Sequence, residues 1–329
     1  MTLSEIAYAG FGFSGFTSFA RHLNRRRLMI LAYHGLHDGG ADSFDNFDGL
    51  ELDVSRFERQ MEYLSGRSHV IPLGGCLSET DELYRVVVTF DDAYASVYDL
   101  AFPVLKRLGL PATVFVPTDF VEGRQAMWWD RLRAAVRVAP EIGVVIRGVR
   151  RVHTTRTMAE KRVAVEALAE EVKTLDVSER ERVLGEIASP ACGGVVRGRQ
   201  PMTIEQMREM GSHNVTFESH GRSHVSLPSL APDLAIDDLL ESKRRLEQWF
   251  SRRVEWVAYP YGHYDDTTAG LIARAGFRGA VTTEDGFADP TRPFALRRVC
   301  VGDPVSFQQF LGGLSGIREV IGRTLGGRG

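Results

Sequence analysis

An α/β fold is predicted by three features of the 329-residue sequence. Short runs that are apolar throughout alternate with segments of helical periodicity, and titratable residues follow the ends of the runs. Strands that are apolar on both faces are typical of parallel sheets covered by helices. About seven such runs occur, so we expect a (β/α) barrel, complete or incomplete, with an open doubly wound sheet as the alternative.

The expected strands are bounded by turn residues or lead into polar loops. In chain order they are LMILAYHG (28–35), RVVVTF (85–90), ATVFVP (112–117), NVTFESH (214–220), VEWVAYPYG (254–262), GAVTT (279–283) and FALRRVCVG (294–302).

The expected helices carry recognisable start and stop signals. Ser55 is placed to cap a helix that ends near Gly66, Gly109 ends a second helix, and Thr203 and Gln206 form a capping box. The helical segments are 55–66, 97–108, 202–210, 236–250 and 267–276.

Residues 127–200 interrupt this alternation. The segments 127–138 and 158–187 read as helices, and no comparable strand separates them. We therefore expect a barrel over 28–310 with a helical insertion at 127–200, preceded by an N-terminal segment (1–27) and followed by a C-terminal tail (311–329).

Composition restricts the class of protein. A formal net charge of −3 argues against broad nucleic-acid binding, which needs a basic face. Cys76, Cys192 and Cys300 are isolated and odd in number, which disfavours a disulfide framework or a thiolate zinc site and fits a reducing compartment.

No apolar stretch of 18 residues and no signal-peptide pattern occurs, so the default expectation is a cytoplasmic protein. An N-terminal segment packed on the domain is the simple interpretation. The alternative is peripheral membrane contact, with the aromatic and basic side chains resting on a membrane surface. These are Phe11, Phe13, Phe16, Phe19, Arg21, Arg25, Arg26 and Arg27.

Titratable residues gather at the expected strand ends, where parallel α/β folds place their functional groups. His220 and His224 are four residues apart and can face one ion, although solvated loop histidines would look the same. A carboxylate from the Asp91–Asp92 pair would complete a three-ligand site with an open position, as in catalytic zinc sites. The other carboxylate would then be free to accept a proton from water. The alternative is that the pair only complements the dipole of the next helix.

Several stretches resemble one family. The segment from VVVTFDD to ATVFV (86–116) resembles the first motif of polysaccharide deacetylases, the NodB-homology or carbohydrate esterase family 4 domain. FESHGRSHVSL (217–227) resembles the second motif, and AYPYG (258–262) resembles a variant of the third. LAYHG and LRRV are similar to elements of the subgroup that acts in surface and extracellular polysaccharide pathways. The resemblance covers about residues 28–303, apart from the insertion.

The resemblance implies a distorted (β/α)7 barrel and metal-dependent hydrolysis of an N-acetyl, N-formyl or O-acetyl group on a sugar. It makes Asp91 the general base and Asp92, His220 and His224 the ligands of a divalent metal, most simply Zn²⁺. It places an oxyanion-binding backbone N–H at Tyr261.

The sequence departs from the family pattern in three places. Ala93 replaces the glycine usual after the aspartates, the third motif lacks its arginine, and no late leucine-x-histidine motif exists. Arg298 is our candidate to orient the base. His34 is the candidate general acid, with His263 as the rival.

Residues for the sugar are also suggested by the sequence. Tyr259, Pro260 and Trp129 are candidates for substrate binding. The stretch Trp128–Asp130 would equally suit an anchored helix start.

The leading hypothesis is therefore a metal-dependent carbohydrate N-deacetylase whose partner is an acetylated polysaccharide or lipid-linked sugar. One alternative is a catalytically impaired glycan-binding homologue, motivated by the missing arginine and histidine. A hydrolase of another bond, such as a phosphoester, is a third, although no phosphate-cradling glycine loop is evident.

Overall fold

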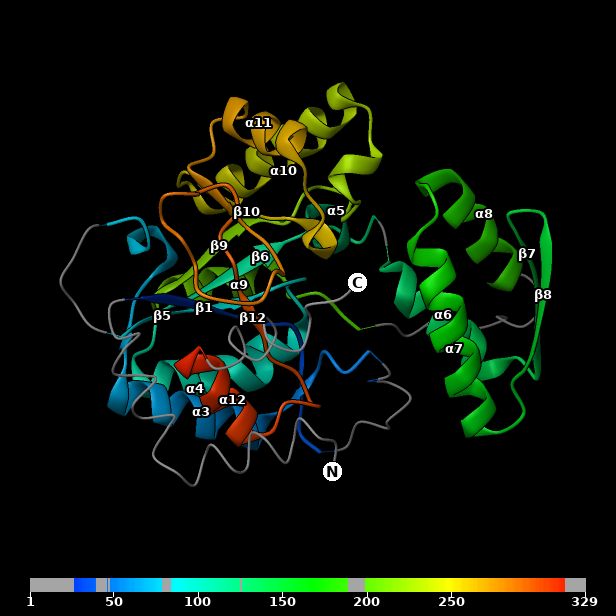
Figure 1. Ribbon diagram of the computed structural model, residues 1–329, viewed down its shortest axis with the longest axis horizontal. Coiled ribbons are helices and arrows are strands. Elements are labelled where there is room, and N and C mark those ends of the chain that lie inside the picture. Colours follow the sequence, from blue (N-terminus) through cyan, green and yellow to red (C-terminus); the bar gives the residue numbers. More distant parts are fainter. Residues whose placement is uncertain are drawn as a thin grey trace.

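A computed structural model describes residues 27–39, 46, 48–78, 84–124, 126–188 and 199–316. A curled sheet of parallel strands forms its centre, in the order β11-β10-β9-β6-β5-β1-β12 (Figure 1). All seven expected strands are confirmed, as is the α/β class with the form of a distorted, partly open barrel. Their bounds are β1 Leu28–Tyr33, β5 Arg85–Phe90, β6 Ala112–Val116, β9 Val215–Ser219, β10 Trp256–Ala258, β11 Gly279–Val281 and β12 Val299–Cys300.

Three short strands were not predicted from the sequence. β4 (His69–Val70) pairs with β5, and β2 (Leu36–His37) pairs with β3 (Leu52–Asp53) outside the main sheet. Two residues are too few to give a periodic pattern, so only the tertiary pairing reveals them.

The sheet curls because one segment joins its two ends. Leu296 forms a parallel bridge to Val281 of β11, and Val299 then pairs with Leu31 of β1. The intervening residue Arg298 is therefore carried into the interior of the curl.

Helices cover the convex side of the sheet. In Figure 1, α10 (Pro232–Phe250) and α11 (Asp266–Arg274) lie above the sheet, and α3 (Val54–Arg67), α4 (Phe102–Leu108) and α12 (Phe307–Ser315) lie below it. Shorter elements complete the barrel: α5 (Thr118–Val121), α9 (Ile204–Gly211) and single 3₁₀ turns at Leu73–Gly75, Leu227–Ser229 and Pro260–Gly262.

The helix signals were mostly correct. Gly109 ends α4 at φ 65°, and Thr203 and Gln206 form the expected capping box. Ser55 was the wrong cap for α3, because the Asp53 side chain accepts the N–H groups of Ser55 and Arg56. The expected helix over 97–108 is interrupted, since Val97–Ala101 forms a π-helical turn before α4.

Alternation along β1 divides the core into two layers. Met29, Leu31 and Tyr33 pack outward with Phe57 of α3, whereas Leu28 and Ile30 face the inside of the curl. The same alternation on β5 turns Thr89, and then Asp91, toward Arg298 inside the curl.

The segment between α5 and α9 forms a separate lobe, at the right of Figure 1. It contains α6 (Trp128–Val138), α7 (Met158–Lys173) and α8 (Val177–Ala188), with its own apolar core. It also contains an antiparallel hairpin, β7 (Glu141–Ile146) and β8 (Val149–Thr154), which the sequence analysis did not predict. A two-residue turn with positive φ at Arg147 and Gly148 joins these strands, as hairpins prefer.

A buried ionic network ties this lobe to the barrel. Asp130 of α6 accepts a hydrogen bond from the Arg133 guanidinium and one from the Arg199 backbone N–H at 3.2 Å. The Arg199 guanidinium pairs with Glu51 at 2.8 Å and Asp48 at 3.2 Å on the barrel side. Asp130 therefore anchors the start of α6. For this residue the structure favours the anchored helix start over the sugar-binding role that the sequence also allowed.

Some expectations lie outside the described residues. They concern the aromatic and basic residues of segment 1–26, Cys192 and most of the tail. α12 runs through position 310, where the sequence analysis ended the barrel. Among the described helices, none combines the length and the apolar character needed to cross a membrane.

The Asp130 anchor predicts a pH dependence of stability. Burial raises the pKa of Asp130 to about 6, and Arg133 and Arg199 only partly oppose this effect. The folded state thus holds this proton more tightly than the unfolded state. The stabilisation is complete below pH 4 and is lost as the pH rises through 6. Relative to Asp130→Asn, the wild-type protein should lose about 1–3 kcal/mol of unfolding free energy between pH 4 and 7.

Urea unfolding of both proteins at several pH values measures this difference. Exposed Asp237→Asn serves as the control and should track the wild-type protein at every pH. Parallel curves for the wild-type protein and Asp130→Asn would contradict the expectation.

Candidate metal centre and active site

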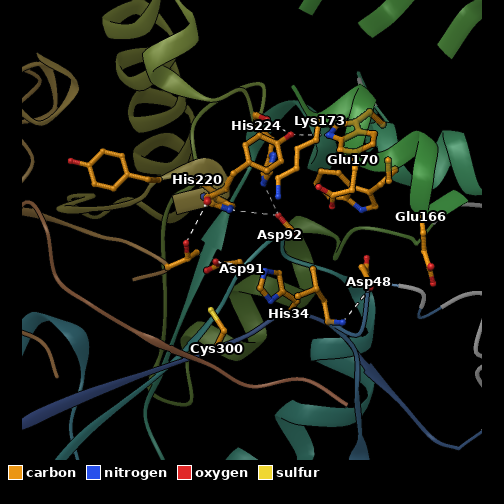
Figure 2. Close-up of a pocket in the computed structure, with 17 residues that line it drawn as sticks. His34, Asp48, Asp91, Asp92, Glu166, Glu170, Lys173, His220, His224 and Cys300 are labelled. Carbon is orange, nitrogen blue, oxygen red and sulfur yellow. Dashed lines mark hydrogen bonds and ion pairs between the residues drawn. The ribbon is translucent and has the colours of Figure 1, made fainter. Parts of the chain in front are cut away.

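Asp92, His220 and His224 come together at the carboxyl ends of β5 and β9 (Figure 2). All three are buried, and their candidate ligand atoms lie within 4.8 Å of one another. The Asp92 Oδ1 atom is 3.2 Å from His224 Nε2 and 3.6 Å from His220 Nε2. A carboxylate oxygen and two imidazole nitrogens thus face one point.

The protonation of His220 suits a metal ligand. Its Nδ1 lies 2.8 Å from the carbonyl oxygen of Ala258. The ring must donate a proton there, which leaves the Nε2 lone pair directed at Asp92 and His224. Burial, assisted by repulsion from His224, lowers the pKa of His220 to about 4, so the ring is neutral at pH 7.

Asp92 supplies the negative charge of the cluster. Burial would raise the pKa of its carboxyl, but the neighbouring imidazoles of His224, His34 and His220 outweigh burial and lower it. Its Oδ1 atom is buried without a hydrogen-bond partner. An unpartnered buried carboxylate oxygen beside two imidazole nitrogens fits a divalent cation, because such a set matches the donor types of catalytic metal sites.

Asp91 is held by Arg298 rather than by the histidine pair. Arg298 Nη1 and Nη2 donate to Asp91 Oδ1 and Oδ2, both at 2.7 Å. The guanidinium is 0% exposed and also bonds Thr89 Oγ1 at 3.2 Å and the Thr282 carbonyl at 2.8 Å. Burial acts to raise the pKa of Asp91, but Arg298 and the nearby histidines outweigh it and lower the pKa.

The two candidate acids lie in different places. His34 lines the cavity of the metal cluster, with Nε2 at 3.9 Å from Asp91 Oδ2. His263 does not line that cavity, and its Nδ1 lies 3.2 Å from Ser226 Oγ. The geometry thus brings His34, but not His263, into the cavity of the candidate metal site.

Strained backbone surrounds the cluster. Asp92, Ala93, His224 and Tyr261 have φ values of 69°, 54°, 52° and 61°, in the left-handed region. At Ala93 this conformation costs about 1 kcal/mol relative to a glycine-like backbone, which gives a physical reason for the glycine that the family pattern has there. Such strain gathers at functional sites because surrounding packing can hold it.

Tyr261 lies between the barrel and the inserted lobe. Its hydroxyl accepts from Trp128 Nε1 at 2.8 Å and donates to the His224 carbonyl at 3.3 Å. Among the described residues, none accepts a hydrogen bond from the Tyr261 backbone N–H. That donor is therefore free for a ligand.

Aromatic side chains wall the cavity. Trp129 packs edge-on against His224, with ring centroids 5.1 Å apart, and its Nε1 donates to Tyr94 at 3.0 Å. The rings of Trp128 and Trp129 line the cavity. Tyr259 borders it but is 0% exposed, and its hydroxyl donates to the Phe294 carbonyl at 2.9 Å, so its predicted role in substrate binding is wrong for the ring. Pro260 is buried and does not line the cavity.

The cavity measures about 490 Å³ and has a wall that the sequence analysis missed. Glu166, Ala169, Glu170 and Lys173 of α7 line it, and Figure 2 labels the three charged residues. Their helical spacing puts them on one face of α7. That spacing was readable from sequence, but it could not show that this face meets the barrel. Asp48, Leu50, Thr283 and Cys300 complete the lining.

Known proteins resemble this chain in sequence. A sequence model of the polysaccharide deacetylase family matches residues 79–280. YxkH of Bacillus subtilis (strain 168), whose name refers to polysaccharide deacetylase, is 23% identical over 291 residues, covering 86% of this chain and 75% of YxkH.

Solved structures share the fold. The Streptococcus pyogenes deacetylase PplD, in complex with acetate, superposes with a TM-score of 0.58 at 20% identity, covering 88% of this chain and 99% of PplD. IcaB from Ammonifex degensii gives 0.54 at 19% identity, covering 88% and 97%. Since the family sequence model spans more than half of the sequence, this chain belongs to the polysaccharide deacetylase family.

Proposed function

We propose that this protein is a metal-dependent deacetylase that removes an N-acetyl or related acyl group from a sugar within a polysaccharide or lipid-linked glycan. The observation that carries the proposal is the pair of adjacent carboxylates with different partners. Asp92 faces two imidazoles, and Asp91, in the same cavity, is held by an arginine. Asp92 is thus placed to bind a metal ion, and Asp91 is placed to accept a proton.

Asp92, His220 and His224 would hold the cation, which we expect to be Zn²⁺. When bound, it supplies Lewis-acid polarisation of the acyl carbonyl and lowers the pKa of water.

Asp91 accepts the proton of the attacking water. Its pKa is lowered, so the carboxylate is ionised at neutral pH and available as a base. Arg298 fixes both oxygens and therefore the direction of the free lone pairs. Arg298 lies in the segment that joins β11 to β1. It orients the base, which is the role of the arginine that is missing from the third motif.

His34 donates the proton to the leaving amine, because it lies in the cavity beside Asp91. The Tyr261 backbone N–H, free of other partners, binds the oxyanion of the tetrahedral intermediate. Trp129 supplies an apolar face against which a sugar ring can pack, whereas Tyr259 is 0% exposed and its ring is not available to a substrate.

Substitutions of the two aspartates should differ in their effect on metal binding. Asp92→Asn and His224→Gln should weaken metal binding by at least about 10–100-fold, the size of effect seen for supporting residues alone. Asp91→Asn should keep the metal. The measurement is bound metal by mass spectrometry after dialysis against graded chelator. Equal retention by Asp92→Asn and the wild-type protein would contradict the ligand assignment.

Loss of the base should affect turnover without affecting metal content. Asp91→Asn should lower kcat by about 10²–10⁴-fold, the contribution of general base catalysis. Arg298→Lys keeps the charge but loses the two-pronged contact, so it should lower kcat while bound metal stays unchanged. The assay is release of acetate from N-acetylglucosamine oligomers, with activity lost on chelation and restored by metal. Full activity of Asp91→Asn would refute its role.

The same assay decides between the two histidines. His34→Gln should lower kcat by about 10²-fold or more, because the amine then leaves without a proton donor. His263→Gln should lose much less. The reverse order would exchange their assignments, and glycan binding without turnover across metals and pH would favour the binding homologue instead.

A further inference from the structure

A second cavity, of about 570 Å³, adjoins the metal cavity. It lies between the α7–α8 turn of the inserted lobe and the barrel loops that follow β9 and β10. Glu170, Lys173 and Tyr261 line both cavities, so the two are parts of one cleft. The barrel contributes Val225, Ser226, Ser229 and His263, and the lobe contributes Thr174, Leu175, Asp176, Val177 and Arg180.

Arg180 is an unusual member of this lining. Arg180 is 3% exposed, its guanidinium lies over the Trp128 ring at 6.0 Å, and its charge opposes the rise that burial causes in the Tyr261 pKa. Its Nε atom has no hydrogen-bond partner, and no carboxylate of the described residues lies within ion-pair distance of its guanidinium. Buried charges are normally paired, because desolvation of an unpaired ion is costly. This guanidinium therefore favours an anion that enters the cavity.

Lys173 adds a second positive charge to the same cavity. It forms no ion pair with any residue in the described part of the chain, and its charge acts with burial to lower the pKa of His263. Two carboxylates also line the cavity. Asp176 is occupied as a helix cap, since its Oδ1 accepts the Glu179 N–H at 2.9 Å, and Glu170 pairs with neither cation.

We propose that this second cavity is a subsite for an oxyanion carried by the substrate, bound by Arg180 and Lys173. The group would be a phosphate or a carboxylate on the sugar chain, beside the acylated residue. This inference rests on the proposed function, since it assumes that a glycan occupies the metal cavity. Because Arg180 and Tyr261 line the same cavity, an anion there would lie next to the residue that offers the oxyanion-binding N–H.

Binding of simple sugars by the full-length, metal-loaded protein tests the subsite. The probes are glucose 1-phosphate, glucuronic acid and neutral methyl glucoside, followed by ligand-observed NMR titration. None carries an acyl group, so no probe is turned over. At least one anionic sugar should bind tighter than the neutral one, and the phosphate and carboxylate probes distinguish the two sources of charge.

Substitutions identify which basic side chains bind the anion. Arg180→Gln and Lys173→Gln should each weaken binding of the anionic sugar, by about 10-fold or more for Arg180, as expected for loss of a charge-assisted hydrogen bond. Methyl glucoside binding should not change. Arg150→Gln, an exposed arginine on the lobe that lines neither cavity, is the matched control.

Two results would overturn the proposal. One is equal binding of charged and neutral sugars, and the other is anion binding that survives both substitutions. If Arg180→Gln does not fold, two other variants test the subsite. They are Lys173→Gln, at an exposed residue, and Arg180→Lys, which keeps the charge. If the protein releases acetate but binds charged and neutral sugars equally, the subsite proposal is wrong and the proposed function stands. If it binds the anionic sugar but releases no acetate, the proposed function is wrong and the anion site stands.

Discussion

The burial of Asp91 is the constraint on which much of this structure depends. An ionised carboxylate inside a barrel needs a fixed counter-charge, and Arg298 provides it with two hydrogen bonds of 2.7 Å. Arg298 reaches Asp91 only because the segment around it runs from β11 to β1 and curls the sheet. The same segment thus closes the fold and orients the candidate base. Disruption of this segment would therefore remove the counter-charge that holds Asp91.

The fold was largely predictable because its signals are local. Apolar runs marked all seven strands of the main sheet, and adjacent aspartates with histidines four apart marked the strand ends that meet. The contact between Arg298 and Asp91 spans more than 200 residues, so sequence could offer only a strand-end position. The β7–β8 hairpin was missed although Ile142, Val144 and Ile146 alternate, because the charged helices around it dominated the pattern. The α7 wall depends on how the lobe docks, which no local pattern encodes.

Tyr261 connects the parts of the cleft. Its hydroxyl bonds Trp128 of the lobe and the His224 carbonyl of the barrel, and Arg180 of the lobe lines the same cavity. Its backbone N–H has no protein acceptor among the described residues. A substrate that occupies the cleft would therefore contact one residue fixed from both sides. Pre-organised donors of this kind require little rearrangement during reaction.

The inserted lobe has an apolar core of its own, built from α6, α7, α8 and the hairpin. It joins the barrel through the ion pairs of Arg199 and through contacts of Trp128 and Trp129. The α7 residues that shape one side of the cleft therefore belong to a helix that packs in a core separate from the strands that carry the aspartates and histidines. Selection can alter that side residue by residue without repacking the barrel. A lineage could thus change the shape and charge of this wall while the strands that carry the aspartates and histidines stayed constant.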